Sequence, residues 1–101
     1  MNQFLSFLPD SWRRGWQARA QERRGNALYK RGEWGEAIAA YEAALAMDAQ
    51  RPHLLMNLGL ALYKAERRPE AREAWKAALS LVEGHNPYLE EQVRILLRQF
   101  G

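Results

Sequence analysis

Residues 25–44 read GNALYKRGEWGEAIAAYEAA, and residues 59–78, GLALYKAERRPEAREAWKAA, repeat the same plan 34 positions later. Small and aromatic residues recur together at this offset, in the pairs Gly25 and Gly59, Ala37 and Ala71, Tyr41 and Trp75, and Ala44 and Ala78. Both copies also carry a Leu-Tyr-Lys triplet at the same phase. A fixed period in the range of roughly 20–50 residues is typical of solenoid proteins.

The glycine of each copy lies inside a helical pattern, where glycine costs about 1 kcal/mol relative to alanine. Because Gly25 and Gly59 take this cost at the same phase, we expect a neighbouring helix to approach each of them closely. The recurring alanines are the small residues expected on the facing helix. Tyr41 and Trp75 follow these alanines by four positions, so they share a face with them and supply bulk to the core.

This repeated plan resembles the tetratricopeptide repeat (TPR) family, whose pattern runs W-x2-L-G-x2-Y, then A-x3-F and a final P over about 34 residues. In the second copy the resemblance rests on Leu55, Leu58, Gly59, Leu62, Ala71, Trp75 and Ala78, with Glu83 in place of the proline. The first copy matches at Gly25, Ala37, Tyr41 and Ala44 and departs at Gln21, Arg24 and Ala49. The resemblance covers about two thirds of the chain, residues 18–86.

The resemblance implies an all-α fold, a TPR-type solenoid of helical hairpins with about five helices. At 101 residues the chain is one domain. We predict an N-terminal capping or interaction segment at 1–17, repeats at 18–51 and 52–85, and a C-terminal capping helix at 86–101. Two repeats are fewer than the three or so that a solenoid needs, so the flanks are expected to cover its open ends.

Local signals predict where the helices begin and end. The first should be one long helix over about 12–31, with Asp10 or Ser11 as its cap. Proline suits the first turn of later helices, and Asn86 suits the N-cap of the last one. The later helices are predicted at about 34–47, 52–65, 69–82 and 87–100. Their core-facing positions are Ala37, Ile38, Tyr41, Ala44, Leu45, Leu55, Leu58, Leu62, Ala71, Ala74, Trp75, Ala78, Leu79 and Val82.

The N-terminal segment is a candidate assembly segment. Its large apolar residues are Phe4, Leu5, Phe7, Leu8, Trp12 and Trp16. They fit a cap on the first repeat, self-association through a groove, or contact with an external partner or a membrane surface. Arginine mixed with tryptophan also fits a nucleic-acid surface, in which arginine contacts phosphates and tryptophan stacks on bases. The spacing of four places both tryptophans on one helix face, which favours a core position.

Charge is unevenly distributed along the chain. Residues 1–31 carry seven basic and two acidic residues, a net charge of +5, whereas the remaining 70 residues have a net charge of −2. This asymmetry favours self-association or acidic partners, and a solvated helix face explains it equally well. There is no cysteine, which excludes a disulfide framework and a thiolate zinc site. No apolar run reaches the length of a transmembrane segment, and we expect a cytoplasmic protein.

In the TPR family the first helix of each repeat lines the concave face of the solenoid. Carried over by position, the resemblance implies partner binding by Arg19, Arg23, Asn26, Lys30, His53, Met56, Asn57, Leu60, Tyr63, Lys64, Arg94 and Arg98. One branch of the family clamps the C-terminal carboxylate of chaperone tails with Lys, Asn, Asn, Lys and Arg. Asn26 and Asn57 match its two asparagines, but Glu22, Pro87 and Glu91 stand at basic positions, which argues against such a clamp.

The sequence contains no constellation typical of an enzyme. His53 and His85 are its only histidines and lie 32 positions apart, and no nucleophile motif or phosphate-binding glycine loop is present. We predict no catalytic activity, metal or cofactor. The favoured function is a protein–protein interaction module that binds a peptide or helix of a partner protein in the concave groove. The alternatives are a self-assembling scaffold, joined through the N-terminal segment, and a small basic nucleic-acid-associated protein.

Overall fold

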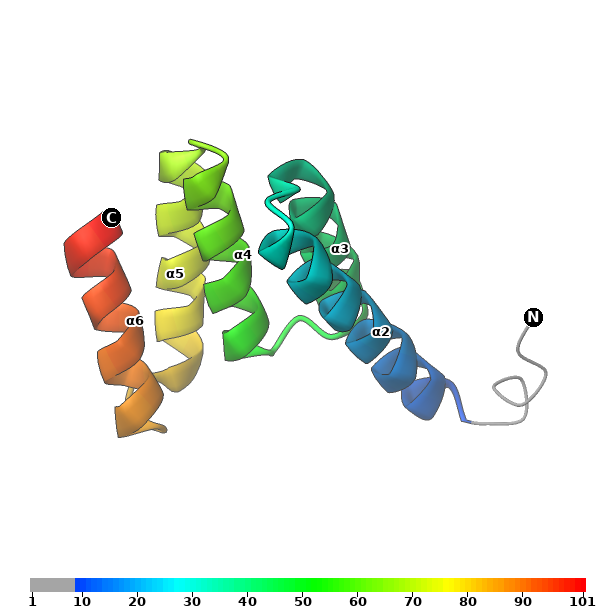
Figure 1. The fold of residues 1–101 in the computed structure, drawn as a ribbon. Helices are drawn as coiled ribbons and strands as arrows, with labels where there is room; N and C mark the ends of the chain where they lie inside the picture. Colours follow the sequence, from blue (N-terminus) through cyan, green and yellow to red (C-terminus); the bar gives the residue numbers. More distant parts are fainter. Residues whose placement is uncertain (1–8) are drawn as a thin grey trace.

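The structure is a computed structural model that describes residues 9–101. Five α-helices follow one another, and residues 9–101 contain no strand. The helices are α2 (Asp10–Lys30), α3 (Trp34–Met47), α4 (Pro52–Lys64), α5 (Arg68–Val82) and α6 (Pro87–Phe100) (Figure 1). Within this part of the chain, none of the helices has the length and apolar character needed to cross a membrane.

The helices form two hairpins followed by a single helix. α2 packs along α3, and α4 packs along α5. Contacts between α3 and α4 join the hairpins side by side, and α6 lies against α5 at the far end of the row (Figure 1). This arrangement confirms the predicted all-α fold, a row of helical hairpins with five helices.

Most of the predicted helix bounds agree with the structure, but the start of α2 does not. α3 and α6 span the predicted residues, and the side-chain oxygen of Asn86 caps α6 by accepting the backbone N–H of Leu89 at 3.1 Å. α2 begins at Asp10, earlier than predicted, and neither Asp10 nor Ser11 caps it. Pro9 occupies the N-cap position instead, because its extended backbone directs its carbonyl to the first helical N–H groups.

The turns inside the two hairpins are equivalent in position but hold different residues. Gly32 lies in the α2–α3 turn with a φ of 77°, and Glu66, 34 positions later, lies in the α4–α5 turn with a φ of 63°. Left-handed backbone costs a residue with a Cβ atom roughly 1–2 kcal/mol, whereas glycine adopts it readily. The second hairpin therefore carries backbone strain that the first one avoids.

Replacing Glu66 with glycine should relieve that strain. The Glu66→Gly variant is expected to gain about 0.5–1 kcal/mol in the free energy of unfolding, because the relief exceeds the extra entropy of glycine in the unfolded chain. Urea unfolding followed by circular dichroism measures the change. The reverse exchange at the other turn, Gly32→Ala, should destabilise the protein. A Glu66→Gly variant less stable than the parent would contradict this account of the turn.

The repeated glycines lie against the repeated aromatic rings. A Cβ atom added to Gly25 would lie 2.7 Å from ring carbons of Tyr41, and one added to Gly59 would lie 2.6 Å from a ring carbon of Trp75. Real Cβ atoms essentially never approach heavy atoms so closely. The predicted close approach at both glycines is confirmed. The groups that fill the space are the aromatic rings, rather than the alanines expected opposite.

One core runs through the row of helices. Its largest fully buried side chains are Trp75, Tyr41, Leu54 and Val93. The positions predicted to face the core are buried, except Leu45, Leu55 and Leu79, which are partly buried against it. Leu54 was not among the predicted positions. Leu54 and Leu55 are adjacent, and neighbouring residues in a helix point about 100° apart. Only one of the two leucines can therefore point directly into the core, and in the structure that residue is Leu54.

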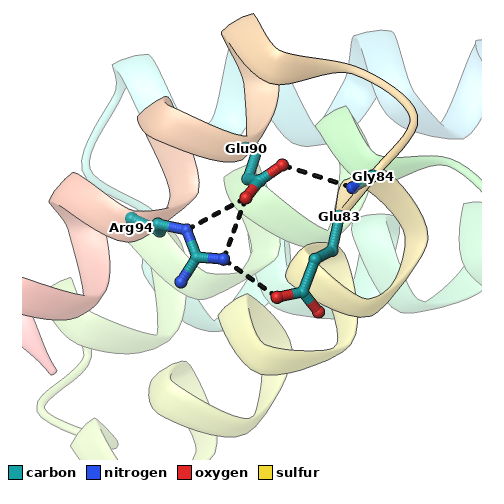
Figure 2. Close-up of polar contacts among 4 residues, drawn as sticks. All are labelled: Glu83, Gly84, Glu90 and Arg94. Carbon is teal, nitrogen blue, oxygen red and sulfur yellow. Dashed lines mark hydrogen bonds and ion pairs between the residues drawn. The ribbon is translucent and has the colours of Figure 1, made fainter.

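An ion-pair cluster fastens the start of α6 to the end of α5 (Figure 2). Arg94 of α6 donates to Glu90, one turn earlier, and to Glu83, which follows α5, both at 2.9 Å. The second carboxylate oxygen of Glu90 accepts the backbone N–H of Gly84 at 3.3 Å. The hydrogen bond from Arg94, with a further contribution from Gly84, lowers the pKa of Glu90 below its ordinary value of 4.5.

This cluster predicts a loss of stability in acid. Because the pKa of Glu90 is lower in the folded chain, the unfolded chain binds a proton first as the pH falls. Stability should therefore decrease as the pH falls from about 4.5 through the lowered pKa. In thermal unfolding across this range, Glu90→Gln should have a midpoint that depends less on pH than the parent does. Glu36→Gln, which removes a carboxylate from the surface of α3, should keep the parental dependence, and equal slopes for the parent and Glu90→Gln would contradict the prediction.

The other end of α6 is held by aromatic contacts. The ring of Phe100 lies edge-on to Tyr63, with centroids 5.0 Å apart, and its centroid lies 6.3 Å from that of Trp75. Arg72 of α5 donates to the backbone carbonyl of Gly101 at 3.0 Å. Both ends of α6 are thus fixed, so the helix lies firmly across the apolar side of α5.

Candidate functional site

The first helices of the two hairpins, α2 and α4, enclose a cavity of about 160 Å³, called here the α2–α4 pocket. Its lining is drawn from three helices and consists of Asn26, Tyr29, Lys30, Tyr41, Asn57 and Leu60. Four of these residues, Asn26, Lys30, Asn57 and Leu60, belong to the set predicted to bind a partner. They meet because α2 and α4 come to the same side of the row while α3 supplies the floor.

A hydrogen bond inside the pocket fixes the orientation of Asn26. The hydroxyl of Tyr41 donates to the side-chain oxygen of Asn26 at 2.6 Å. Since that oxygen is occupied, the amide NH₂ group of Asn26 remains as a donor. Asn57 adds a second amide and Lys30 an ammonium group, and no carboxylate lies in the lining. The pocket therefore supplies donors to a ligand that carries hydrogen-bond acceptors.

An acidic residue one turn before Asn26 is already paired. Glu22 of α2 accepts a hydrogen bond from Arg51, in the link between the hairpins, at 2.5 Å. Their side chains keep only 19% and 28% of their exposed area, so water screens this pair less than a surface pair. The ion pair offsets the negative charge of Glu22 and ties α2 to the start of α4.

Burial also changes the acidity of the pocket floor. Tyr41 is almost fully buried, and this burial, aided by nearby Tyr29 and Glu22, raises its pKa from 10.0 to about 12. A phenol with a raised pKa stays protonated at neutral pH and continues to donate to Asn26. The floor therefore acts as a fixed hydrogen-bond donor.

Alkaline unfolding should reveal this tyrosine. Because the pKa of Tyr41 is higher in the folded chain, the unfolded chain ionises first, and stability should fall as the pH rises from 10 to about 12. Tyr41→Phe should cost about 1 kcal/mol at neutral pH, through the lost hydrogen bond. It should also reduce the alkaline slope of stability, measured by urea unfolding at several pH values. Tyr88→Phe, at a highly exposed position, is the control and should leave that slope unchanged.

Several other residues predicted to bind a partner are engaged in contacts within the chain. The ammonium of Lys64 lies 5.9 Å from the ring centroid of Trp34, and Tyr63 is part of the aromatic group around Phe100. Arg94 belongs to the cluster at the start of α6, and Arg98 pairs with Glu91 at 3.2 Å. These four residues stabilise the ends of α4 and α6, and none of them lines the α2–α4 pocket.

The remaining predicted residues lie outside the pocket. Arg19, Arg23 and His53 are exposed. Met56 is partly buried against the core, and its backbone carbonyl accepts the indole N–H of Trp75 at 3.2 Å. Sequence reasoning missed Tyr29 as a pocket residue and placed Tyr41 only in the core. Their signal was present, since Tyr29 belongs to the recurring Leu-Tyr-Lys triplet and Tyr41 to the recurring aromatic position.

The two tryptophans of α2 do not take the predicted core positions. Trp12 keeps 61% and Trp16 56% of its exposed area. The buried side of α2 passes through Gly25, and nine residues correspond to 2.5 helical turns, so Trp16 points to the opposite side. The equal spacing predicted a shared face correctly, but that face is turned to solvent. Predictions for Phe4, Leu5, Phe7 and Leu8 lie outside the described residues.

Two larger hollows have less suitable linings. One of about 560 Å³, between the start of α2 and the end of α3, is lined by Asp10 and Arg13, which pair with each other. The other, of about 450 Å³, lies between α3 and α5 over Leu55 and Leu62. These leucines stand where the repeat pattern has tryptophan and tyrosine, so smaller side chains leave this space. The first hollow also contains Arg14, but carboxylates line both hollows, and neither combines unpaired donors with a lining free of carboxylates as the α2–α4 pocket does.

Comparison with known proteins agrees with the architecture. A family model described as "TPR repeat" matches residues 25–66, and a second, described as "Tetratricopeptide repeat", matches residues 52–85. A search of curated proteins found no match. The two family matches together span more than half of the chain, from the last part of α2 to the end of α5. TPR repeats generally mediate protein–protein interactions. The chain belongs to the tetratricopeptide repeat family.

Proposed function

We propose that this protein is a non-catalytic interaction module that binds a peptide or helix of a partner protein along the face formed by α2, α4 and α6. The α2–α4 pocket is the centre of that face. The observation that carries the proposal is the meeting of Asn26, Lys30, Asn57 and Leu60 in one pocket that offers donors and no carboxylate. A polypeptide supplies backbone carbonyls that such donors can bind.

The proposal can be tested with peptides selected against the full chain from a random display library. The double variant Lys30→Ala with Asn57→Ala removes two pocket donors. Each lost hydrogen bond is worth about 1 kcal/mol, so the selected peptides should bind roughly 10-fold or more weakly in isothermal titration. Asn26 is left unchanged in this test because its replacement would also disturb Tyr41.

A control of matched composition is available on α5. The double variant Lys76→Ala with Ser80→Ala also removes one lysine and one small polar residue, from positions that do not line the pocket. It should bind the selected peptides as the parent does. Circular dichroism should show the same helical signal for all three proteins. Peptides that bind the pocket variant with parental affinity would refute the proposed site.

A second proposed function is self-assembly through the N-terminal segment, favoured by the exposure of Trp12 and Trp16. Light scattering on the full chain and on a variant that starts at Ser11 measures the mass directly. A larger full-length species that becomes a monomer on truncation would support a scaffold role. Monomers in both samples would leave the pocket as the surface for a partner.

A further inference from the structure

The basic residues of the chain differ sharply in whether they have partners. All 15 lysines and arginines lie within the described residues. Ten of them have an ion pair, a hydrogen bond or an aromatic ring within reach: Arg13, Arg31, Arg51, Lys64, Arg67, Arg68, Arg72, Lys76, Arg94 and Arg98. The five without such a contact among residues 9–101 are Arg14, Arg19, Arg23, Arg24 and Lys30. All five lie on α2.

Three of these five cations share one line along α2 with the exposed tryptophans. The line, called here the α2 stripe, consists of Trp12, Trp16, Arg19, Arg23 and Lys30. Successive members are separated by four, three, four and seven residues, which are the spacings of a single helix face. The stripe lies on the side away from buried Gly25, and all of its members are exposed.

No acidic residue of α2 neutralises the stripe. The helix contains two carboxylates, and each is engaged elsewhere, Asp10 with Arg13 and Glu22 with Arg51. Most acidic residues of α5 and α6 are also paired within the chain. Among residues 9–101, four side-chain carboxylates have no ion pair: Glu36 and Glu42 on α3, and Asp48 and Glu66 in the links. A second copy therefore offers only these scattered carboxylates, and an acidic segment of a different molecule complements the stripe better.

We propose that the partner segment bound by this module is acidic. The basic residues of the α2 stripe bind its carboxylates, and the tryptophans of the stripe contact an apolar residue beside them. This inference rests on the proposed function and adds the chemistry of the partner. The stripe runs from Trp12 to Lys30, a rise of about 27 Å along the helix axis, which an extended segment of roughly 8 residues spans. Arg19 and Arg23 are about 6 Å apart along the axis, close to the spacing of alternate residues in an extended chain.

The shape of the surface favours a polypeptide over a nucleic acid or a membrane. The stripe is one residue wide, which suits a single chain better than the plane of a bilayer or the two backbones of a duplex. At Lys30 it reaches the α2–α4 pocket, where the amides of Asn26 and Asn57 can bind backbone carbonyls. One continuous surface thus offers charge to acidic side chains and donors to a main chain.

The test uses the full-length protein and a fluorescein-labelled peptide of roughly 10 residues, long enough to span the stripe. The peptide has two leucines followed by alternating glutamate and serine, and a matched peptide has glutamine for each glutamate. Fluorescence anisotropy should show binding of the glutamate peptide that weakens with salt, and much weaker binding of the glutamine peptide. The triple variant Arg19→Gln, Arg23→Gln and Lys30→Gln should lower affinity for the glutamate peptide by about 5- to 20-fold.

The control variant removes the same charge from other positions. Arg14→Gln, Arg24→Gln and Lys76→Gln lie off the stripe and should change the affinity by less than about 2-fold. Equal losses in both triple variants would overturn the inference, because only net charge would then matter. Tighter binding of poly(U) RNA, or of vesicles rich in phosphatidylserine, than of the glutamate peptide would overturn it in favour of those ligands. Failure of the glutamate peptide to bind would also overturn it.

Failure of this inference can be told apart from failure of the proposed function. If library peptides bind through Lys30 and Asn57 but glutamate and glutamine peptides bind equally, the groove is a peptide site and the acidic preference is wrong. If no library peptide depends on Lys30 and Asn57, the proposed groove itself is wrong. The two experiments share Lys30, but the first depends also on Asn57 of the pocket and the second on Arg19 and Arg23 of the stripe.

Discussion

Replacing Trp75 with alanine should lower the free energy of unfolding by about 3–5 kcal/mol. The side chain is fully buried, so its removal leaves a large cavity between α4 and α5. The exchange also removes the indole N–H that donates to the carbonyl of Met56 and the ring beside Phe100. Small domains are stable by only about 5–15 kcal/mol, so the variant should be partly unfolded at room temperature or close to it.

Trp12→Ala is the matched control, since it makes the same exchange at a position that keeps 61% of its exposed area. It should change the free energy of unfolding by no more than about 0.5 kcal/mol. Urea unfolding, followed by circular dichroism, compares both variants with the parent. Similar losses at the two positions would show that Trp75 does not hold α4 against α5 as described.

Replacing Gly59 with alanine should destabilise the protein even though alanine is the better helix former. The added Cβ atom would overlap the indole of Trp75, with a ring carbon only 2.6 Å away. Because Trp75 is fully buried, it cannot move aside without disturbing its neighbours, and overpacking of this kind typically costs about 1–3 kcal/mol or more. The gain of about 1 kcal/mol in helix propensity offsets only part of that cost.

Gly15→Ala is the matched control for this variant. Gly15 also lies inside a helix, but nothing lies within 4 Å of the Cβ atom that the exchange would add. Gly15→Ala should therefore stabilise the protein by about 0.5–1 kcal/mol. Opposite signs at the two positions, measured by thermal or urea unfolding, would verify that packing and not backbone entropy fixes glycine at position 59. A stabilised Gly59→Ala variant would contradict the close packing.

The repeat pattern was sufficient to predict the helical hairpins, because its signals are local and periodic. Tyr41 and Trp75 occupy the core, and the repeated glycines Gly25 and Gly59 are required by these neighbouring rings. Even the difference between Gly32 and Glu66 occurs at equivalent turns. At these positions the spacing of residues in the sequence was enough to predict which side chains pack together.

The site was predictable only in part. Helical spacing placed Trp12 and Trp16 on one face, but which face is buried depends on where α3 lies against α2. The family pattern gave the residues of the first helices, yet it could not tell that Arg94 and Lys64 would be taken up by contacts within the chain. The contact of Lys64 with Trp34 depends on a side chain from a distant segment, whereas Arg94 pairs with Glu90 four residues earlier and with Glu83 at the end of α5. A position-by-position transfer does not contain them.

The contact between Gly59 and Trp75 also limits which substitutions these two positions can accept during evolution. The two positions are sixteen residues apart, as are Gly25 and Tyr41, and the sum of their side-chain volumes is limited by the gap between two helices. Mutations at the two positions should therefore not be independent. In related chains, a larger residue at the glycine position should be accompanied by a smaller one at the aromatic position. A change at either position alone should be rare, because the other side chain must compensate for the change in volume.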